Sequence, residues 1–170
     1  MDNTKSYKEY LHQITTFIFD VDGVLTNGDI QISENGDLLR TMNVKDGFGL
    51  KYAIKQGYKM AIISAGTNQG VKQRLETLGV GDVFLNAQNK LEVFNAFTKK
   101  HHLKPEEILY VGDDVMDIEV MKLVGLACCP QDAVPEVKQI SKYISHKNGG
   151  KGCVREIIEQ VLKVQNKWDF

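Results

Sequence analysis

The chain has 170 residues, which is the length of one domain of ordinary size. Its 21 basic and 22 acidic residues nearly cancel, so the net charge of −1 gives no support for binding to nucleic acid or to an acidic membrane. Three cysteines are too few for a disulfide framework, and no apolar run approaches the ~20 residues that cross a bilayer. The polar segment at residues 1–10 lacks the apolar core of a signal peptide. We therefore expect a soluble, cytoplasmic, single-domain protein that spans residues 1–170.

Short apolar runs alternate along the chain with stretches of helical spacing. The runs, which are rich in β-branched and aromatic residues, predict strands at residues 14–19, 58–63, 83–85, 108–111 and 123–128, and a weaker one at 143–144. The helical stretches cover residues 47–56, 68–78, 90–101, 115–122, 135–140 and 153–165. This alternation predicts an α/β fold, in which a parallel sheet is covered by helices on both faces.

The connection between the first two predicted strands is too long for a simple crossover. It has roughly forty residues, where about a dozen are enough. Asn35-Gly36 lies at its centre and is a strong signal for a two-residue hairpin turn. We expect a β-hairpin insert at about residues 28–44. Because a lone hairpin is marginal in water and this one carries Ile30, Ile32, Leu38 and Leu39, we expect it to pack against another subunit.

Polar residues follow the first four strands of the predicted parallel sheet. They are two carboxylates, a hydroxyl, a lysine at a helix start and three more carboxylates, in the order Asp20, Asp22, Ser64, Lys90, Asp113, Asp114 and Asp117. The carboxyl ends of parallel strands meet at one edge of a sheet, where ligands of α/β proteins bind. So many carboxylates repel one another unless a cation is bound, and oxygen ligands suit Mg²⁺ completed by a substrate phosphate. The set predicts phosphoryl transfer through an aspartyl-phosphate intermediate.

Four motifs in chain order resemble those of the haloacid dehalogenase-like (HAD) phosphatases. They are FDVDGVLT at residues 19–26, Ser64, Lys90 and GDDVMD at residues 112–117. A closer resemblance, over about residues 14–161, is to the sugar-acid phosphatases of this family that act on 3-deoxy-D-manno-octulosonate 8-phosphate (KDO 8-phosphate) in lipopolysaccharide biosynthesis. It rests on residues 43–49, on Arg74 and on residues 149–156. The resemblance implies a three-layer HAD-like fold with the hairpin insert and no cap domain.

The resemblance also implies a role for each matching residue. Asp20 is expected to be the nucleophile and a Mg²⁺ ligand, and Asp22 the general acid and base that also binds the metal through its backbone carbonyl. Asp113 is expected to be the remaining metal ligand, in a loop supported by Asp114 and Asp117. Ser64 and Lys90 are expected to hold the phosphoryl group. Expected contacts to the sugar acid come from Asn43, Val44, Lys45, Asp46, Gly47, Lys51 and Arg74.

The resemblance further implies a homotetramer, in which four hairpins pack together and a neighbour's C-terminal segment approaches each site. One position departs from the family pattern, because Gly66 stands where many members have arginine, in Ser64-Ala65-Gly66 instead of Thr-Gly-Arg. This departure leaves open a related nine-carbon substrate, such as KDN 9-phosphate or N-acetylneuraminate 9-phosphate.

Two alternatives come from other classes of protein. A receiver domain also gathers aspartates and a lysine, but its phosphoacceptor follows the third strand, where this chain has Leu85-Asn86. A non-catalytic regulatory subunit of this fold would not need the complete acidic and basic set. The sequence leaves three smaller questions open: whether Arg74 is simply exposed, whether residues 149–152 form a lid, and whether the tail from Trp168 to Phe170 packs at an interface.

Overall fold

The computed structural model describes residues 6–170, so the first half of the polar segment at residues 1–10 lies outside the described residues. A six-stranded parallel sheet forms the centre of the fold, in the order β5-β4-β1-β6-β7-β8. Its strands are β1 (Thr16–Phe19), β4 (Lys59–Ile63), β5 (Asp82–Phe84), β6 (Ile108–Val111), β7 (Leu126–Cys129) and β8 (Tyr143–Ile144). This order confirms the predicted parallel α/β architecture.

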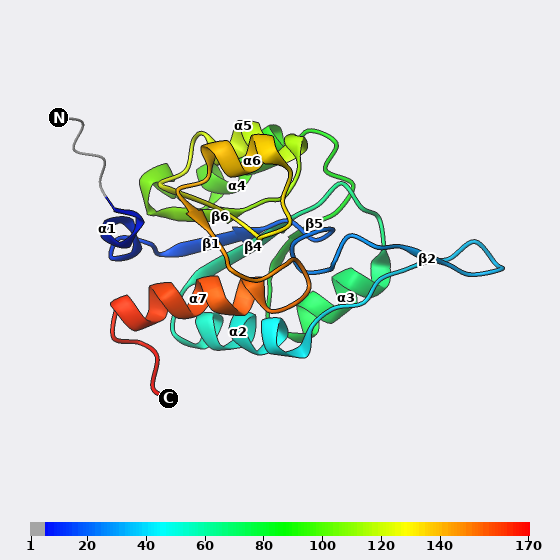
Figure 1. The fold of residues 1–170 in the computed structure, drawn as a ribbon, viewed down its shortest axis with the longest axis horizontal. Coiled ribbons are helices and arrows are strands. Elements are labelled where there is room, and N and C mark those ends of the chain that lie inside the picture. Colours follow the sequence, from blue (N-terminus) through cyan, green and yellow to red (C-terminus); the bar gives the residue numbers. More distant parts are fainter. Residues whose placement is uncertain (1–5) are drawn as a thin grey trace.

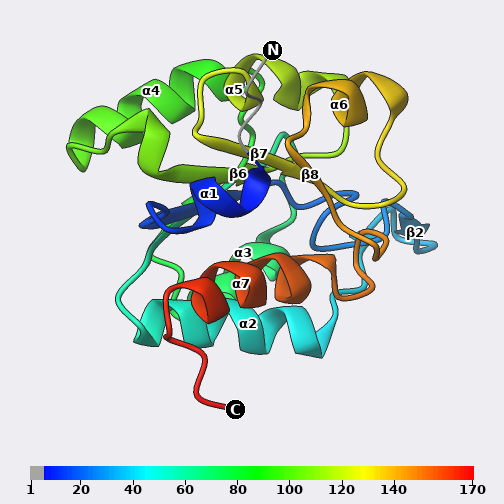
Figure 2. The same ribbon diagram turned by 60° about the vertical axis from the view of Figure 1, so that its left-hand side comes forward.

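Helices cover both faces of the sheet, as Figures 1 and 2 show. One layer contains α2 (Val44–Lys55), α3 (Gln69–Thr77) and α7 (Cys153–Val164), and the other contains α4 (Lys90–Lys100), α5 (Ile118–Met121) and α6 (Pro135–Ile140). Short 3₁₀ turns, η1 (Pro105–Glu107) and η2 (Val115–Asp117), connect elements of the second layer. No helix in the described part of the chain is both long and apolar enough to cross a membrane.

The buried strands divide the core into two layers. In β1, Phe17 and Phe19 pack into the cluster formed with α2 and α7, while Ile18 packs into the cluster formed with α4 and α5. This alternation follows from the two-residue period of side chains along a strand. It explains why every residue of β1 is buried, and why the strand reads in the sequence as a continuous apolar run.

The hairpin forms where it was predicted, but its turn differs. Strands β2 (Gln31–Ile32) and β3 (Leu38–Leu39) are antiparallel, and within residues 6–170 no other strand pairs with them. The Ser33 N–H donates to the Asp37 carbonyl at 3.0 Å, and the Gly36 N–H donates to the Ser33 carbonyl at 2.9 Å. Gly36 has φ +84°, so the loop has three residues with a left-handed glycine rather than the expected two-residue turn. The hairpin extends away from the sheet (Figure 1).

Two further elements differ from the prediction. The short helix α1 (Tyr7–Leu11) begins with a capping box of Ser6 and Glu9, which the sequence analysis did not use. Strand β7 starts at Leu126, three residues later than expected. The preceding Gly125 lies so close to η1 that a Cβ atom there would be 2.0 Å from the Glu106 carbonyl oxygen. That contact holds residues 123–125 in a loop before the strand can begin.

The C-terminal tail folds back on helix α2 of the same chain. The rings of Trp168 and Tyr52 lie 5.0 Å apart, and those of Phe170 and Phe48 lie 5.9 Å apart. The Tyr52 hydroxyl donates to the Asp169 carboxylate at 3.1 Å. In the single chain, these aromatic contacts give the tail a defined position on α2.

Candidate active site

A hollow of about 290 Å³ opens at the carboxyl ends of the central strands. Among the residues that line it are six that the sequence analysis discussed: Asp20, Asp22, Ser64, Gly66, Lys90 and Asp113. The loop after β1 supplies the first two, the loop after β4 supplies the next two, the start of α4 supplies the lysine, and the loop after β6 supplies Asp113. The topology therefore brings together the catalytic and metal-binding residues expected from the sequence.

Lys90 lies at the centre of a buried ion cluster. Its Nζ atom is 2.6 Å from Oδ2 of Asp20 and 2.7 Å from Oδ1 of Asp117, and its side chain is only 3% exposed. Burial alone would lower the pKa of Lys90, but the two carboxylates more than offset that effect and the pKa is raised. Lys90 thus remains a fixed positive charge beside the expected nucleophile.

Asp117 anchors this cluster more extensively than a supporting loop residue would. Its carboxylate is fully buried and accepts hydrogen bonds from Lys90, from the Tyr110 hydroxyl at 2.7 Å and from the backbone N–H of Asp113 at 3.1 Å. A Cβ atom on Gly112 would lie 2.4 Å from the Cβ atom of Asp117. The glycine of the GDD segment is therefore required for the loop to fold over this carboxylate.

The carboxylates of the hollow carry more negative charge than one lysine can balance. Oxygen atoms of Asp20, Asp113 and Asp117 lie within 4.8 Å of one another. Burial, followed by repulsion from Asp117, raises the pKa of Asp20 to about 7, although Lys90 opposes the shift. Burial, followed by repulsion from Asp20 and Asp117, raises the pKa of Asp113 to about 8. The oxygen donors and their unbalanced charge fit a small divalent cation such as Mg²⁺.

Asp22 is held by a residue that the sequence analysis missed. Both of its carboxylate oxygens accept hydrogen bonds from Arg40, from Nε at 3.0 Å and from a terminal guanidinium nitrogen at 3.1 Å. Arg40 follows β3 at the base of the hairpin, outside all four motifs. No spacing or motif in the sequence pairs it with Asp22, because the contact depends on how the hairpin folds back over the loop after β1.

The residues expected to contact the sugar acid do not line this hollow. Asp46 is buried and accepts hydrogen bonds from the N–H groups of Gly152 and Arg155, at 3.2 and 2.8 Å, at the start of α7. Asn43 caps α2 by accepting from the Lys45 N–H at 2.8 Å. The exposed members of the set are Val44, Lys45, Lys51 and Arg74, and the Arg74 guanidinium would be 3.0 Å from a Cβ atom on Gly47.

The glycine segment at residues 149–152 packs against the loop after β1. A Cβ atom on Gly149 would lie 1.9 Å from the Gly23 carbonyl oxygen, and the Gly150 N–H donates to the Val24 carbonyl at 2.9 Å. Since Asp46 binds the end of the same segment, residues 43–47 and 149–152 form a continuous support for the loop that carries Asp22. The glycines thus allow close backbone packing, and the segment is not a free lid in this structure.

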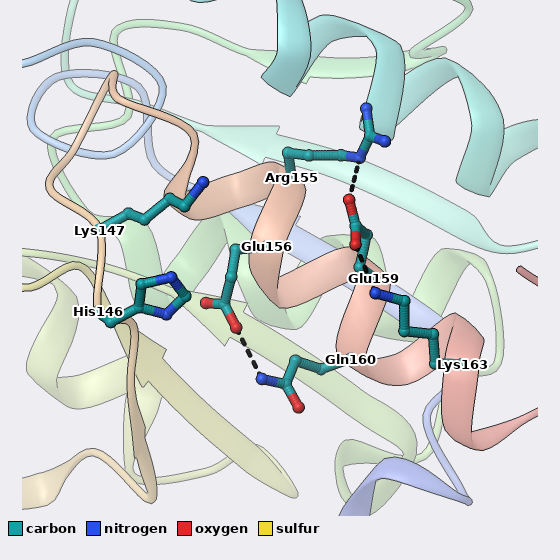
Figure 3. A pocket seen from close by; sticks show the side chains of 7 residues that line it. All are labelled: His146, Lys147, Arg155, Glu156, Glu159, Gln160 and Lys163. Carbon is teal, nitrogen blue, oxygen red and sulfur yellow. Dashed lines mark hydrogen bonds and ion pairs between the residues drawn. The ribbon is translucent and has the colours of Figure 1, made fainter. Parts of the chain in front are cut away.

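A larger hollow of about 430 Å³ lies between α7 and residues 146–147, which follow the edge strand β8 (Figure 3). Its two acidic side chains already have partners within the chain. Glu159 pairs with Arg155 and Lys163, while Glu156 accepts from Gln160, from Tyr143 and from Ser145. Although this hollow is larger, both of its carboxylates are already bound within the chain and it contains none of the residues of the four motifs, so the candidate active site is the hollow that contains Asp20.

Comparison with known proteins matches residues 77–157 to the sequence model of the haloacid dehalogenase-like hydrolases. The 3-deoxy-D-manno-octulosonate 8-phosphate phosphatase KdsC of Salmonella typhi is 38% identical over 156 residues, which cover 92% of this chain and 83% of that protein. The crystal structure of the corresponding Yersinia pestis phosphatase is 32% identical, with a TM-score of 0.92 over 95% of this chain and 87% of that chain. That of the Moraxella catarrhalis phosphatase, in complex with a magnesium ion, a phosphate ion and KDO, is 31% identical, with a TM-score of 0.93 over 96% and 94%.

Proposed function

This chain belongs to the haloacid dehalogenase-like hydrolases and, within them, to the 3-deoxy-D-manno-octulosonate 8-phosphate phosphatases, and from that premise we propose that it converts KDO 8-phosphate to KDO and phosphate. It is a phosphoric monoester hydrolase. The observation that supports the reaction most strongly is the cluster at the carboxyl edge of the parallel sheet, where the buried Asp20 pairs with Lys90 beside the partly buried Asp113. A nucleophile, a fixed cation and a metal-binding carboxylate are the parts that phosphoryl transfer to an aspartate requires.

In this proposal, Asp20 is the nucleophile that accepts the phosphoryl group. Its Oδ1 accepts a hydrogen bond from the Val21 N–H at 2.6 Å, and its Oδ2 accepts one from the Lys90 ammonium group. These two contacts give the carboxylate one orientation in the hollow. The Ser64 hydroxyl lies in the lining of the same hollow, where it can donate to a phosphoryl oxygen. The Lys90 ammonium group places a fixed positive charge near the phosphoryl oxygens. The two side chains together hold the group during transfer.

The residues that would hold Mg²⁺ are the carboxylates of Asp20 and Asp113 and the backbone carbonyl of Asp22. Bound there, the ion supplies positive charge that neutralises the phosphate and the attacking carboxylate. Gly23 supports this geometry, because a Cβ atom on it would lie 1.9 Å from an Asp113 carboxylate oxygen. Burial, followed by repulsion among the carboxylates, raises the pKa values of Asp20 and Asp113, and a cation bound there would oppose both effects.

We assign the proton transfers to Asp22. Its carboxyl group gives a proton to the sugar oxygen as the bond from that oxygen to phosphorus breaks and the bond from Asp20 to phosphorus forms. It then takes a proton from the water that hydrolyses the aspartyl-phosphate. Asp22 lines the hollow and its side chain is 34% exposed, so it can reach both the leaving group and water.

Recognition of the sugar acid is proposed for the segment of Asn43, Val44, Lys45, Asp46 and Gly47, in which the buried Asp46 holds the segment in place, and for Lys51 and Arg74. Since none of them lines the hollow in the single chain, a substrate would reach them only beyond its rim or across a subunit boundary. Arg74 is the best partner for the substrate carboxylate, because it is exposed and carries a planar guanidinium that can bind a carboxylate through two hydrogen bonds. A nine-carbon sugar acid phosphate is the second candidate substrate, because Gly66 leaves the second motif without its usual cation.

We propose that the protein is a cytoplasmic homotetramer. The hairpin exposes Ile30, Ile32, Leu38 and Leu39 by 44%, 74%, 43% and 50%, on a two-stranded sheet that has no further strand in the described part of the chain. Such an apolar surface is expected to be covered by other copies of the hairpin. Cys128, Cys129 and Cys153 are all buried and unpaired, as is usual in a reducing compartment.

Phosphate release from a panel of substrates tests the function. The panel contains KDO 8-phosphate, KDN 9-phosphate, N-acetylneuraminate 9-phosphate and glucose 6-phosphate, each with Mg²⁺ and with a chelator. We expect the highest kcat/KM for KDO 8-phosphate with Mg²⁺ and no release with the chelator. Preference for a nine-carbon substrate would replace the proposed substrate, and no release from any phosphomonoester would favour the regulatory subunit.

A further inference from the structure

Arg40 and Asp22 form a planar, two-point ion pair beside the hollow. The two hydrogen bonds, at 3.0 and 3.1 Å, match the two guanidinium donors to the two carboxylate oxygens. The Arg40 side chain is only 7% exposed, so the pair is largely shielded from water on the arginine side. A fork of this kind fixes the plane of the carboxylate as well as its position, which a single contact does not do.

The guanidinium is itself held in place by the base of the hairpin and by the start of α3. It donates a third hydrogen bond, of 2.9 Å, to the Leu38 carbonyl. That carbonyl also accepts from the Asn68 side-chain amide at 2.7 Å, and Asn68 caps α3 by accepting the Val71 N–H at 2.9 Å. Arg40 is therefore fixed before any substrate arrives.

Gly66 leaves the space that the pair occupies. A Cβ atom at this position would lie 3.3 Å from Oδ2 of Asp22, 3.4 Å from the Ser64 hydroxyl and 3.7 Å from the Arg40 guanidinium. Any longer side chain extending in this direction would meet the ion pair. The glycine at position 66 therefore leaves room for Arg40 to pair with Asp22, whereas a large side chain at position 66 would collide with this pair.

We propose that Arg40 is a positioning residue for the reaction, which orients the carboxylate of Asp22 toward the leaving-group oxygen. This inference rests on the proposed function, because it needs Asp22 to deliver the proton. Arg40 acts through Asp22, since Asp22 lines the hollow and Arg40 does not. Each carboxyl oxygen has a second lone-pair direction that Arg40 leaves free, so Asp22 can carry the proton for the leaving group, and later the proton taken from water, in that direction while it keeps its contacts to Arg40.

Two substrates that differ in their need for a proton separate the orientation of Asp22 by Arg40 from any other effect of Arg40. In p-nitrobenzyl phosphate the leaving alkoxide needs a proton, whereas in p-nitrophenyl phosphate the leaving phenolate does not. The ratio of kcat/KM values reports only the steps up to phosphorylation of Asp20, so later hydrolysis does not enter. General acid catalysis contributes about 100- to 10,000-fold. For Arg40→Met we expect a loss on the benzyl ester at least about tenfold larger than the loss on the phenyl ester.

Controls keep this test interpretable. Arg155→Met makes the same chemical change outside the hollow that contains Asp20. It should leave the ratio of the two kcat/KM values unchanged. Arg40→Lys retains the charge but contacts one carboxylate oxygen at a time, so it should give an intermediate ratio. If circular dichroism shows that Arg40→Met is unfolded, Arg40→Lys takes its place in the test. Equal losses on both substrates, or no loss in a folded Arg40 variant, would overturn the proposal. Because neither ester is a sugar phosphate, failure of KDO 8-phosphate as the substrate would leave this test unaffected.

Discussion

The Nζ atom of Lys90 lies 2.6 Å from Oδ2 of Asp20, inside a cluster that is almost closed to solvent. The contact has two consequences for the reaction. It fixes one oxygen of the nucleophile, and it places a positive charge where the phosphoryl oxygens of the substrate would lie. Both consequences depend on the carboxylate of Asp20, which leads to the first prediction.

Asp20→Asn is expected to keep the fold and to lose turnover, because an amide does not attack phosphorus. We expect kcat to fall by at least roughly three powers of ten, which is the scale of losing a covalent nucleophile. The measurement is phosphate release with Mg²⁺, accompanied by circular dichroism. Asp82→Asn removes a carboxylate that pairs with Lys100 far from the motifs and should keep its activity. Turnover of Asp20→Asn within tenfold of the wild type would remove the covalent mechanism.

The stability of the metal-free protein is expected to decrease as the pH rises from about 4 to 8. The pKa values of Asp20 and Asp113 are raised in the folded protein to about 7 and about 8, from an ordinary value of 3.8. In this range the folded state keeps protons that the unfolded state has lost, so each increase in pH favours unfolding. Mg²⁺ replaces those protons, and its stabilising effect should therefore be larger at pH 8 than at pH 5.5.

Thermal unfolding with a chelator and with Mg²⁺ at the two pH values checks this prediction. Asp113→Asn should raise the melting temperature of the metal-free protein at pH 8 by about 2–8 °C, because it removes the repulsion among the carboxylates. The same variant should lose most of its response to Mg²⁺, while Asp82→Asn should behave like the wild type. An equal effect of Mg²⁺ at both pH values would contradict the assignment of the raised pKa values to the metal ligands.

Arg74→Ala is expected to impair sugar-acid phosphates selectively. A charged hydrogen bond to the substrate carboxylate is worth roughly 1.5–3 kcal/mol, which corresponds to about one to two powers of ten in kcat/KM. The loss should appear with KDO 8-phosphate and be nearly absent with p-nitrophenyl phosphate. Lys72→Ala removes a partly exposed cation on the same helix and serves as the matched control. Equal losses on both substrates would assign Arg74 a structural or catalytic role.

Ile32→Asp is expected to dissociate the assembly without unfolding the chain. The Ile32 side chain is 74% exposed and pairs only with Leu38 across the hairpin, so the single chain has little to lose from this change. Light scattering should show a tetramer for the wild type and a smaller species for the variant. Leu123→Asp introduces the same charge at an exposed apolar residue outside the hairpin and should remain tetrameric. A wild-type protein that is monomeric at micromolar concentration would exclude this assembly.

The parallel sheet was predictable because its inner strands β1, β4, β6 and β7 are buried on both faces almost throughout and therefore read as apolar runs. The grouping of Asp20, Ser64, Lys90 and Asp113 followed from the same pattern, since parallel strands end at one edge. Helix α1 was missed because its five residues form little more than one turn, and few apolar positions define its period. The start of β7 was missed because a contact between Gly125 and Glu106 decides it, and no local pattern reports such a contact.

The contacts of Asp46 and Arg40 show a second limit of the sequence. Asp46 lies in a segment that resembles a substrate-binding motif, yet both of its carboxylate oxygens accept backbone N–H groups at the start of α7. Arg40 lies in an insert with no motif, yet it holds the carboxylate expected to transfer protons. Both sets of hydrogen bonds join residues that are far apart along the chain. Arg40 reaches Asp22 because the hairpin folds back, and Asp46 binds the end of the glycine segment. The fold alone determines them.

The central claim is that KDO 8-phosphate is hydrolysed through a phosphoryl group carried by Asp20. The stereochemical course at phosphorus tests it most directly, with a phosphorothioate analogue of KDO 8-phosphate whose phosphorus is made chiral by sulfur and two oxygen isotopes and which is hydrolysed in water enriched in the third isotope. Two successive in-line displacements, first by Asp20 and then by water, invert the phosphorus centre twice. The account predicts that the released thiophosphate retains the configuration of the substrate. Net inversion would mean a single direct attack by water, and it would contradict the account.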